Sequence, residues 1–258
     1  MKNDTFRIGT AAWAVPKALT ESFSGEGSHL ERYSQVLNAV EINTSFYRDH
    51  KADTYEKWAK ATPDHFRFAV KLSKVFTHED QLAVDPQQLQ TVVEGIMRLG
   101  EKLAVILIQL PPKLAFHEVT VRRFFELLRS IYQGPIVLEP RHKTWVSPEA
   151  LIVLKDFHVG KVMADPEPCP APIEFQKATH DICYLRWHGS PVIYESRYEA
   201  ESMEELKTRA KELSRDFKEV WIIFDNTTFA WATVNALEMK ALLMKNPRRN
   251  DLGLSPAL

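Results

Sequence analysis

Residues 103–139, LAVILIQLPPKLAFHEVTVRRFFELLRSIYQGPIVLE, carry the clearest signal of the fold. It opens with a short apolar run, 103–109, that ends in a polar residue, which is typical of a buried strand. Thr120 then precedes apolar residues at helical spacing, namely Phe124, Leu127, Leu128 and Ile131. Gly134 and Pro135 close this helix before a second run, 136–139. A strand, a helix and a second strand of this length form one βαβ unit.

The same unit recurs along the whole chain. Short β-branched runs occur at 6–10, 39–43, 66–71, 103–109, 136–139, 159–165, 182–188 and 220–225. Their ends lie about 31 residues apart, the length of one βαβ step. Eight such units predict an α/β fold, a single (β/α)8 TIM barrel spanning residues 1–258 as one domain. An open doubly wound sheet is the alternative, but Gly25-Glu26-Gly27 lacks the third glycine of a dinucleotide-binding fingerprint.

Capping signals mark the helices between these strands. Asp85-Pro86 and Ser147-Pro148 each place a cap before a proline at the first helical position. Ser202 with Glu205 predicts a capping box at the start of another helix. One unit differs, because prolines alternate at 166, 168, 170 and 172. The crossover between the sixth and seventh strands is therefore expected to be irregular and extended.

Composition excludes several classes of protein. The chain has 258 residues, 45% hydrophobic and 26% charged, which argues against disorder. Its 33 Lys and Arg against 34 Asp and Glu give a net charge of -1, which argues against a strongly basic nucleic-acid binder. Two cysteines, no long apolar run and no signal-peptide core at Met1 predict a cytoplasmic protein without a membrane span. The sequence identifies no cofactor.

Polar residues end most of the predicted strands. Barrel enzymes build their sites at the carboxyl ends of the strands, so these residues are expected to meet at one mouth. Alternation along each strand predicts which side chains point inward. The inward set is Glu41, Asn43, Lys71, Gln109, Glu139, Asp165, Arg186, His188 and Asp225; the adjoining loops add Tyr47, Arg48, His78, Arg141, His142, Trp145 and Asn226.

Each of these groups also has a structural interpretation. Glu41 with Lys71, or Glu139 with Arg141, would form an internal salt bridge, and either histidine would serve as a hydrogen-bonded loop residue. Together, however, so many charges at one rim cost several kcal/mol of desolvation per buried ion unless they are paired or bind a ligand. The combination favours a functional pocket.

Ordered motifs across the chain resemble one family. They are IGTAAW (8–13), VEINTSFYR (40–48), FRFAVK (66–71) with His78, QLPP (109–112), LEPRH (138–142) with Trp145, Ala164-Asp165, YLRWHG (184–189) with Tyr198, and FDNT (224–227). The chain resembles the YecE-like proteins, domain of unknown function family 72, from residue 6 to about 240. The resemblance implies a (β/α)8 barrel and no particular reaction. Ala11-Ala12 stands where this family usually reads Ser-Gly, and Asp225 where Asn is common, which argues against either position as a shared catalytic group.

Three hypotheses follow. The first is an enzyme for a small anionic substrate, such as a phosphorylated or carboxylated sugar. Lys71, Arg141 and Arg186 would hold the anion, Glu41 or Glu139 would be the general base, and His188 or His142 the acid. Asn43, Tyr47, His78, Gln109, Trp145 and Asn226 would complete the substrate site. Internal salt bridges that seal the mouth would contradict this hypothesis.

The other two hypotheses use the same mouth differently. A divalent-metal enzyme of the isomerase or endonuclease type would use Glu139, Asp165, His188 and Asp225, although nearby arginines would repel the ion. A nucleic-acid-binding module would stack bases on Trp13, Tyr47, Trp145 and Trp187. The net charge of -1 weighs against binding a long strand. The oligomeric state is not determined by the sequence.

Overall fold

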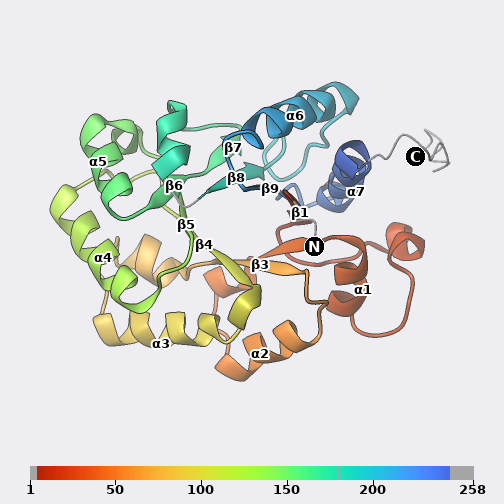
Figure 1. The fold of residues 1–258 in the computed structure, drawn as a ribbon, viewed down its shortest axis with the longest axis horizontal. Helices are drawn as coiled ribbons and strands as arrows, with labels where there is room; N and C mark the ends of the chain where they lie inside the picture. The colour runs from red at the N-terminus through yellow and green to blue at the C-terminus, as the bar shows by residue number, and fades with distance from the viewer. Residues whose placement is uncertain (1–4, 179–180, 245–258) are drawn as a thin grey trace.

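The computed structural model describes residues 5–178 and 181–244 of the chain. Parallel strands lie at the centre and helices surround them (Figure 1). The strands are β1 (Phe6–Thr10), β2 (Ala39–Ile42), β3 (Arg67–Lys71), β4 (Leu103–Gln109), β5 (Ile136–Glu139), β6 (Val159–Lys161), β7 (Met163–Asp165), β8 (Ile182–Trp187) and β9 (Glu219–Phe224). The α-helices are α1 (His29–Val36), α2 (Ala52–Lys60), α3 (Pro86–Met97), α4 (Glu118–Ile131), α5 (Pro148–Asp156), α6 (Ala200–Leu213) and α7 (Trp231–Met244).

All eight predicted strands are present, and Val162 divides the sixth into β6 and β7. The strands form a five-stranded sheet, β2-β3-β4-β5-β6, and a four-stranded sheet, β1-β9-β8-β7. β6 passes directly into β7 at one junction between the sheets. At the other, a single parallel bridge joins Ala11 to Glu41, and the Ala12 amide donates to the Glu41 carbonyl at 2.8 Å. The predicted α/β class is confirmed. The fold is TIM-barrel-like, and its parallel strands are paired in two sheets.

Two apolar layers hold this arrangement. Between strands and helices lies a large cluster that includes Val40, Ile42 and Met163. A smaller cluster fills the space enclosed by the strands, with Ala39 and Ala69 facing bulkier residues such as Trp221. Small side chains opposite large ones fill a narrow interior without voids.

The close approach of β1 to β2 requires a glycine. A Cβ added to Gly9 would lie 2.1 Å from the carbonyl oxygen of Ala39. No side chain tolerates that separation, so any replacement would push the two strands apart. Gly9 therefore permits the junction at which β1 meets the five-stranded sheet.

Helix starts follow the predicted caps in two cases and depart from them in two, one of which is Thr120, since α4 begins at Glu118 with His117 as its N-cap. Asp85 accepts the amide of Gln88 at the start of α3, and Ser147 accepts the amide of Ala150 at the start of α5. The predicted capping box at Ser202 is wrong, because α6 begins at Ala200 with Glu199 as its N-cap. Tertiary contact sets this boundary, since Asn235 holds the backbone amide of Tyr198 just before the helix at 3.2 Å.

The proline-rich crossover is irregular, as expected. After β7, the described residues 166–172 form neither a helix nor a strand, and a 3₁₀ helix, η6 (Ile173–Ala178), follows. Alternating prolines remove the backbone donors that an α-helix needs. Among the described residues, no helix is long and apolar enough to cross a membrane.

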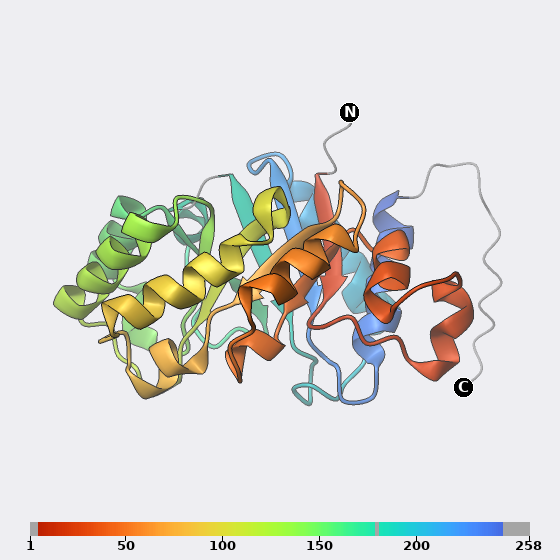
Figure 2. The ribbon, with the colours of Figure 1, turned by 90° about the horizontal axis from the view of Figure 1, so that it is seen from below.

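The fold directs the carboxyl ends of the strands to one face. β1, drawn in red, begins at the upper side in Figure 2, and the loops that follow β8 and β9 lie at the lower edge. Glu41, Lys71, Gln109, Glu139 and Arg186 all belong to strands that end on this lower face. The polar ends of the parallel strands therefore converge there.

Candidate active site

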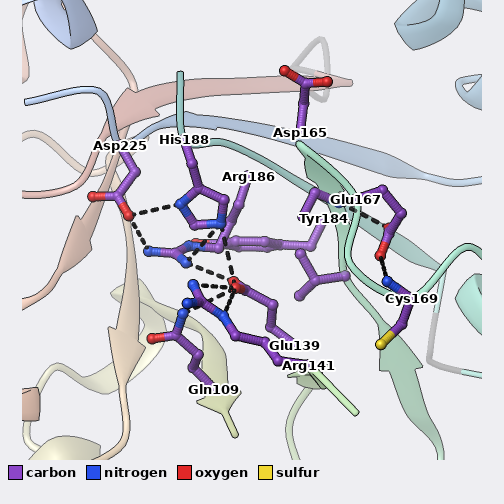
Figure 3. A network of polar contacts seen from close by, with 12 residues as sticks. Gln109, Glu139, Arg141, Asp165, Glu167, Cys169, Tyr184, Arg186, His188 and Asp225 are labelled. Atoms are coloured by element: carbon purple, nitrogen blue, oxygen red, sulfur yellow. Dashed lines mark hydrogen bonds and ion pairs between the residues drawn. The ribbon is translucent and has the colours of Figure 1, made fainter. Parts of the chain in front are cut away.

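Arg186 lies at the centre of the charged mouth. Its side chain is fully buried, and its guanidinium contacts three carboxylates, of which Figure 3 labels Glu139 and Asp225. Nε and Nη2 donate to the two oxygens of Glu41 at 2.9 and 2.8 Å. Nη1 donates to Glu139 Oε2 at 2.5 Å, and Nη2 also donates to Asp225 Oδ2 at 2.9 Å. This fork geometry suits carboxylates and satisfies each donor group of the guanidinium.

The Arg186 contacts cross the interior and join the two sheets. Arg186 belongs to β8 and Asp225 follows β9, both in the four-stranded sheet, whereas Glu41 and Glu139 belong to the five-stranded sheet. Since a buried ion without a partner costs several kcal/mol, the four charges depend on one another. The network therefore fixes the relative position of the strand ends at the mouth.

The Glu139 carboxylate accepts further hydrogen bonds at the same place. Its Oε1 accepts from the Gln109 amide at 2.9 Å and from Arg141 Nη2 at 3.1 Å. Burial opposes ionisation of Glu139, but Arg186 and then His188 outweigh burial and hold its pKa well below the usual value. A carboxylate with so low a pKa is a weak proton acceptor near neutral pH.

His188 bridges two of the carboxylates. Its Nδ1 lies 3.1 Å from Asp225 Oδ2, and its Nε2 lies 3.3 Å from Glu139 Oε1. Burial disfavours the imidazolium, but the hydrogen bonds to Asp225 and Glu139 prevail and raise the pKa of His188 above its usual value. These contacts therefore favour the protonated form of His188, which is the form that can donate a proton.

Lys71 differs from the other charges of the mouth. Its side chain is only 5% exposed, and its ammonium lies 4.0 Å from the centre of the Phe46 ring. Within residues 5–178 and 181–244, no carboxylate lies within ion-pair distance of Lys71. Burial, and then repulsion by Arg186, lower the pKa of Lys71 to about 8, although Glu41 and Asp225 counteract this. The expected Glu41–Lys71 salt bridge is thus absent, because Arg186 occupies both oxygens of Glu41.

Asp165 does not join the cluster. Its carboxylate points away from Arg186 in Figure 3 and accepts from the Tyr198 hydroxyl at 2.6 Å. The predicted inward orientation of Asp165 is wrong, because Val162 takes the interior position and Met163 packs toward the helices. Val162 and Met163 are both apolar, so hydropathy alone does not reveal which one points inward.

The residues proposed for a metal site are consequently divided. Glu139, His188 and Asp225 lie together, but each contacts Arg186 or another residue of its network. No group of three or more His, Cys, Asp or Glu side chains in the described part of the chain is arranged to hold an ion. A guanidinium among these oxygens repels a divalent cation, so the residues do not fit a resident metal.

The remaining predicted residues serve several purposes. His142 accepts the amide of Thr144 and caps the 3₁₀ helix η5 (Lys143–Val146), so it lies outside the network. Trp145 is fully buried, with its indole donating to the Leu114 carbonyl at 2.9 Å. Asn226 is buried and donates to the carbonyl of Ser196 at 2.9 Å, which anchors the loop after β8.

The loop residues Tyr47 and His78 flank Phe46. Both rings stand edge-on to Phe46 at 5.0 Å, and the Tyr47 side chain is 70% exposed. Burial and the nearby cations Lys71 and Arg141 lower the pKa of His78. Of the aromatic residues proposed to stack bases, Trp13 and Trp187 pack against the core, and only Tyr47 is freely exposed.

Three contributors were missed by sequence reasoning. Phe46 covers Lys71, and Tyr184 donates to Glu41 at 2.9 Å. Tyr194 stands edge-on to His188 at 5.8 Å and also contacts Arg141. The inward parity of Tyr184 was available from the strand pattern, but its apolar ring resembles that of any core residue. Tyr194 has a positive φ of 69° in a loop, which gave no signal in the sequence.

The fold and the mouth define a TIM-barrel-like α/β protein with a buried polar site at the carboxyl ends of its strands. The chain belongs to the family described as "Protein of unknown function DUF72", whose family model matches residues 7–256. The expected YecE-like membership is thereby confirmed.

Individual relatives agree over nearly the whole chain. The UPF0759 protein YunF of Bacillus subtilis is 24% identical over 264 residues, covering 92% of this chain and 94% of YunF. A DUF72 family protein from Enterococcus faecalis has a TM-score of 0.77 at 22% identity, over 92% of this chain and 95% of that one. A DUF72 family protein from Thermotoga maritima has a TM-score of 0.75 at 24% identity, over 93% of this chain and 100% of that one. These likenesses support the fold.

Proposed function

We propose that this protein is an enzyme that acts on a small anionic, sugar-like substrate by acid/base chemistry at the barrel mouth. The observation that carries the proposal is Lys71, a residue only 5% exposed, whose ammonium has no carboxylate partner among the described residues although three carboxylates lie in the same mouth. A buried charge that is left unpaired lowers stability, and such arrangements cluster at functional sites.

The balance of charge supports an anionic ligand. Glu41, Glu139 and Asp225 are matched in number by Arg186, Arg141 and Lys71, so a protonated His188 leaves one positive charge in excess. The guanidinium donors of Arg186 are all occupied by internal salt bridges, so Arg186 cannot take the anion-binding role expected from the sequence. Lys71 and the half-buried Arg141 remain to contact a phosphate or carboxylate.

His188 is the proton donor in this proposal. Its raised pKa keeps the imidazolium available, and after donation the neutral ring can take a proton back. Asp225 and Glu139 hold the two ring nitrogens and act as positioning residues. Glu41 is bound by Arg186 and Tyr184 and orients the guanidinium. The lowered pKa of Glu139 argues against the role of general base expected from the sequence.

Calorimetric titration with inorganic phosphate and with citrate at constant ionic strength tests the anion site. We expect the wild type to bind at least one of these anions, and Lys71→Met to weaken binding at least about tenfold, a loss of about 1.4 kcal/mol. Lys161→Met is the matched control, because Lys161 is also buried but pairs with Glu167 at 2.9 Å. Binding that is absent in the wild type, or equal in all three proteins, would overturn the proposal.

A further inference from the structure

Lys71 and Lys161 are both buried lysines, but their surroundings differ. The Lys161 ammonium donates to Glu167 at 2.9 Å and to the Val162 carbonyl at 3.0 Å. The Lys71 ammonium faces the ring of Phe46 and makes no hydrogen bond within the part of the chain that the structure describes. An amine that is desolvated and unpaired gives up its proton more readily than an exposed one and is a better nucleophile.

An unpartnered acceptor lies at the neighbouring strand end. β2 and β3 pair in register as far as Ile42 opposite Val70; Asn43 is the next residue after β2, and Lys71 is the last residue of β3. The Asn43 side-chain oxygen Oδ1 is buried and has no hydrogen-bond partner among residues 5–178 and 181–244. A buried acceptor without a partner costs about 1–3 kcal/mol. A ligand with a hydroxyl group next to its reacting carbon would satisfy Asn43 while that carbon lies at Lys71.

We infer that Lys71 is the nucleophile of this site and forms an imine with the carbonyl group of a small anionic aldehyde or ketone. This inference rests on the proposed function and names its substrate class and first covalent step. Arg141, with a side chain 27% exposed beside the buried network, would hold the phosphate or carboxylate of the same molecule.

The step balances without an oxidant or reductant. The Lys71 ammonium first loses one proton to water, and the neutral amine attacks the carbonyl carbon to form a C–N bond. The His188 imidazolium protonates the carbonyl oxygen. The nitrogen then loses a second proton to His188, and the C–O bond breaks as the hydroxyl takes that proton back from His188 and leaves as water. The proton first released to water restores the His188 imidazolium. The sum converts an ammonium and a carbonyl into an iminium and one water, and one positive charge is retained.

The residues around Lys71 suit these reaction steps. Lys71 interacts electrostatically with Glu139 and Asp225, the same carboxylates that hold His188. The proton donor therefore belongs to the same charge cluster as the nucleophile. The retained positive charge of the iminium keeps the electrostatic balance that the ammonium had, so the network need not rearrange when the bond forms.

Reductive trapping on the wild-type protein tests the inference. The protein is incubated at pH 8 with dihydroxyacetone phosphate or pyruvate and then with cyanoborohydride, and each lysine-containing peptide is quantified by mass spectrometry. Uncharged dihydroxyacetone is the control probe, Lys161 is the buried control residue, and Lys71→Arg is the control variant. At pH 8, an amine with a pKa of about 8 is half neutral, whereas one at 10.5 is neutral in fewer than about 1 in 100 molecules.

We expect an anionic probe to modify Lys71 at least about tenfold more than any exposed lysine, and more than the uncharged probe does. Lys71→Arg should show no adduct at position 71 and only background elsewhere. Trapping of Lys71 no faster than of surface lysines would overturn the inference. If phosphate or citrate still binds in that case, the proposed function stands without the imine; if neither anion binds, the proposed function fails as well. Because the site-resolved measurement uses the wild type, it does not depend on how the variant folds.

Discussion

Replacing Lys71 with methionine is expected to stabilise the protein near neutral pH. The change removes a buried ammonium that has no ion-pair partner among the described residues and keeps an unbranched side chain against Phe46. The pKa of Lys71 falls from 10.5 to about 8, and each tenfold change in the protonation equilibrium is worth about 1.4 kcal/mol. The folded state therefore disfavours the charged form by roughly 3 kcal/mol.

Part of this gain is offset in the variant. The contact of the ammonium with the Phe46 ring is worth about 0.5–2 kcal/mol, and a methionine sulfur near an aromatic ring recovers some of it. We therefore expect the free energy of unfolding at pH 7 to rise by about 1–3 kcal/mol in Lys71→Met. Because the unfolded chain binds this proton more tightly than the folded one, the wild type gains stability as the pH rises from about 8 to 10.5. The advantage of the variant should shrink over that interval.

Urea denaturation at pH 6, 7, 8, 9 and 10 measures this difference directly. Lys161→Met is the control, since it breaks the pair with Glu167 and should be destabilised at every pH. A Lys71→Met variant that is no more stable than the wild type at pH 7 would refute the reasoning. A difference that stays constant between pH 8 and 10 would also refute it, because it would mean that the ammonium is not the source of the cost.

Three further predictions concern other parts of the mouth. Arg186→Met leaves three buried carboxylates without their common cation and should lower the free energy of unfolding by at least about 3–5 kcal/mol. The surface control Arg122→Met should lower it by less than about 1 kcal/mol. Equal losses in denaturation experiments would contradict the central role of Arg186. The pKa of His188 is raised in the folded state, so its charged ring stabilises the protein fully below about pH 6.5, and this stabilisation is lost as the pH rises through the folded pKa. Titration followed by nuclear magnetic resonance should place that pKa above 6.5. A lower value would exclude His188 as the proton donor. Ala12 has a φ of 76°, so Ala12→Gly should raise the free energy of unfolding by about 0.5–1 kcal/mol. If Ala12→Gly instead lowers the free energy of unfolding as much as the control Ala11→Gly does, Ala12 is unstrained.

Much of the fold was available from local patterns. Short apolar runs that end in polar residues are strands wherever both faces are buried, and the cap at Asp85 marks the start of α3 because its side chain accepts an orphan amide. The start of α6 was not available, since the hydrogen bond from Tyr198 to Asn235 joins residues 37 positions apart. Strand parity likewise failed at Asp165, where two adjacent apolar residues conceal which one points inward.

The members of the site were more predictable than their pairing. By itself, the sequence determined that Glu41, Lys71, Glu139 and Arg186 end parallel strands and point inward, because side chains alternate along a strand and parallel carboxyl ends share one face. Which cation each carboxylate binds depends on the tertiary structure. Arg186 binds Glu41 and Glu139 across the interior and leaves Lys71 without an ion-pair partner in the described part of the chain, since one guanidinium can satisfy several carboxylates and an ammonium is a single point charge.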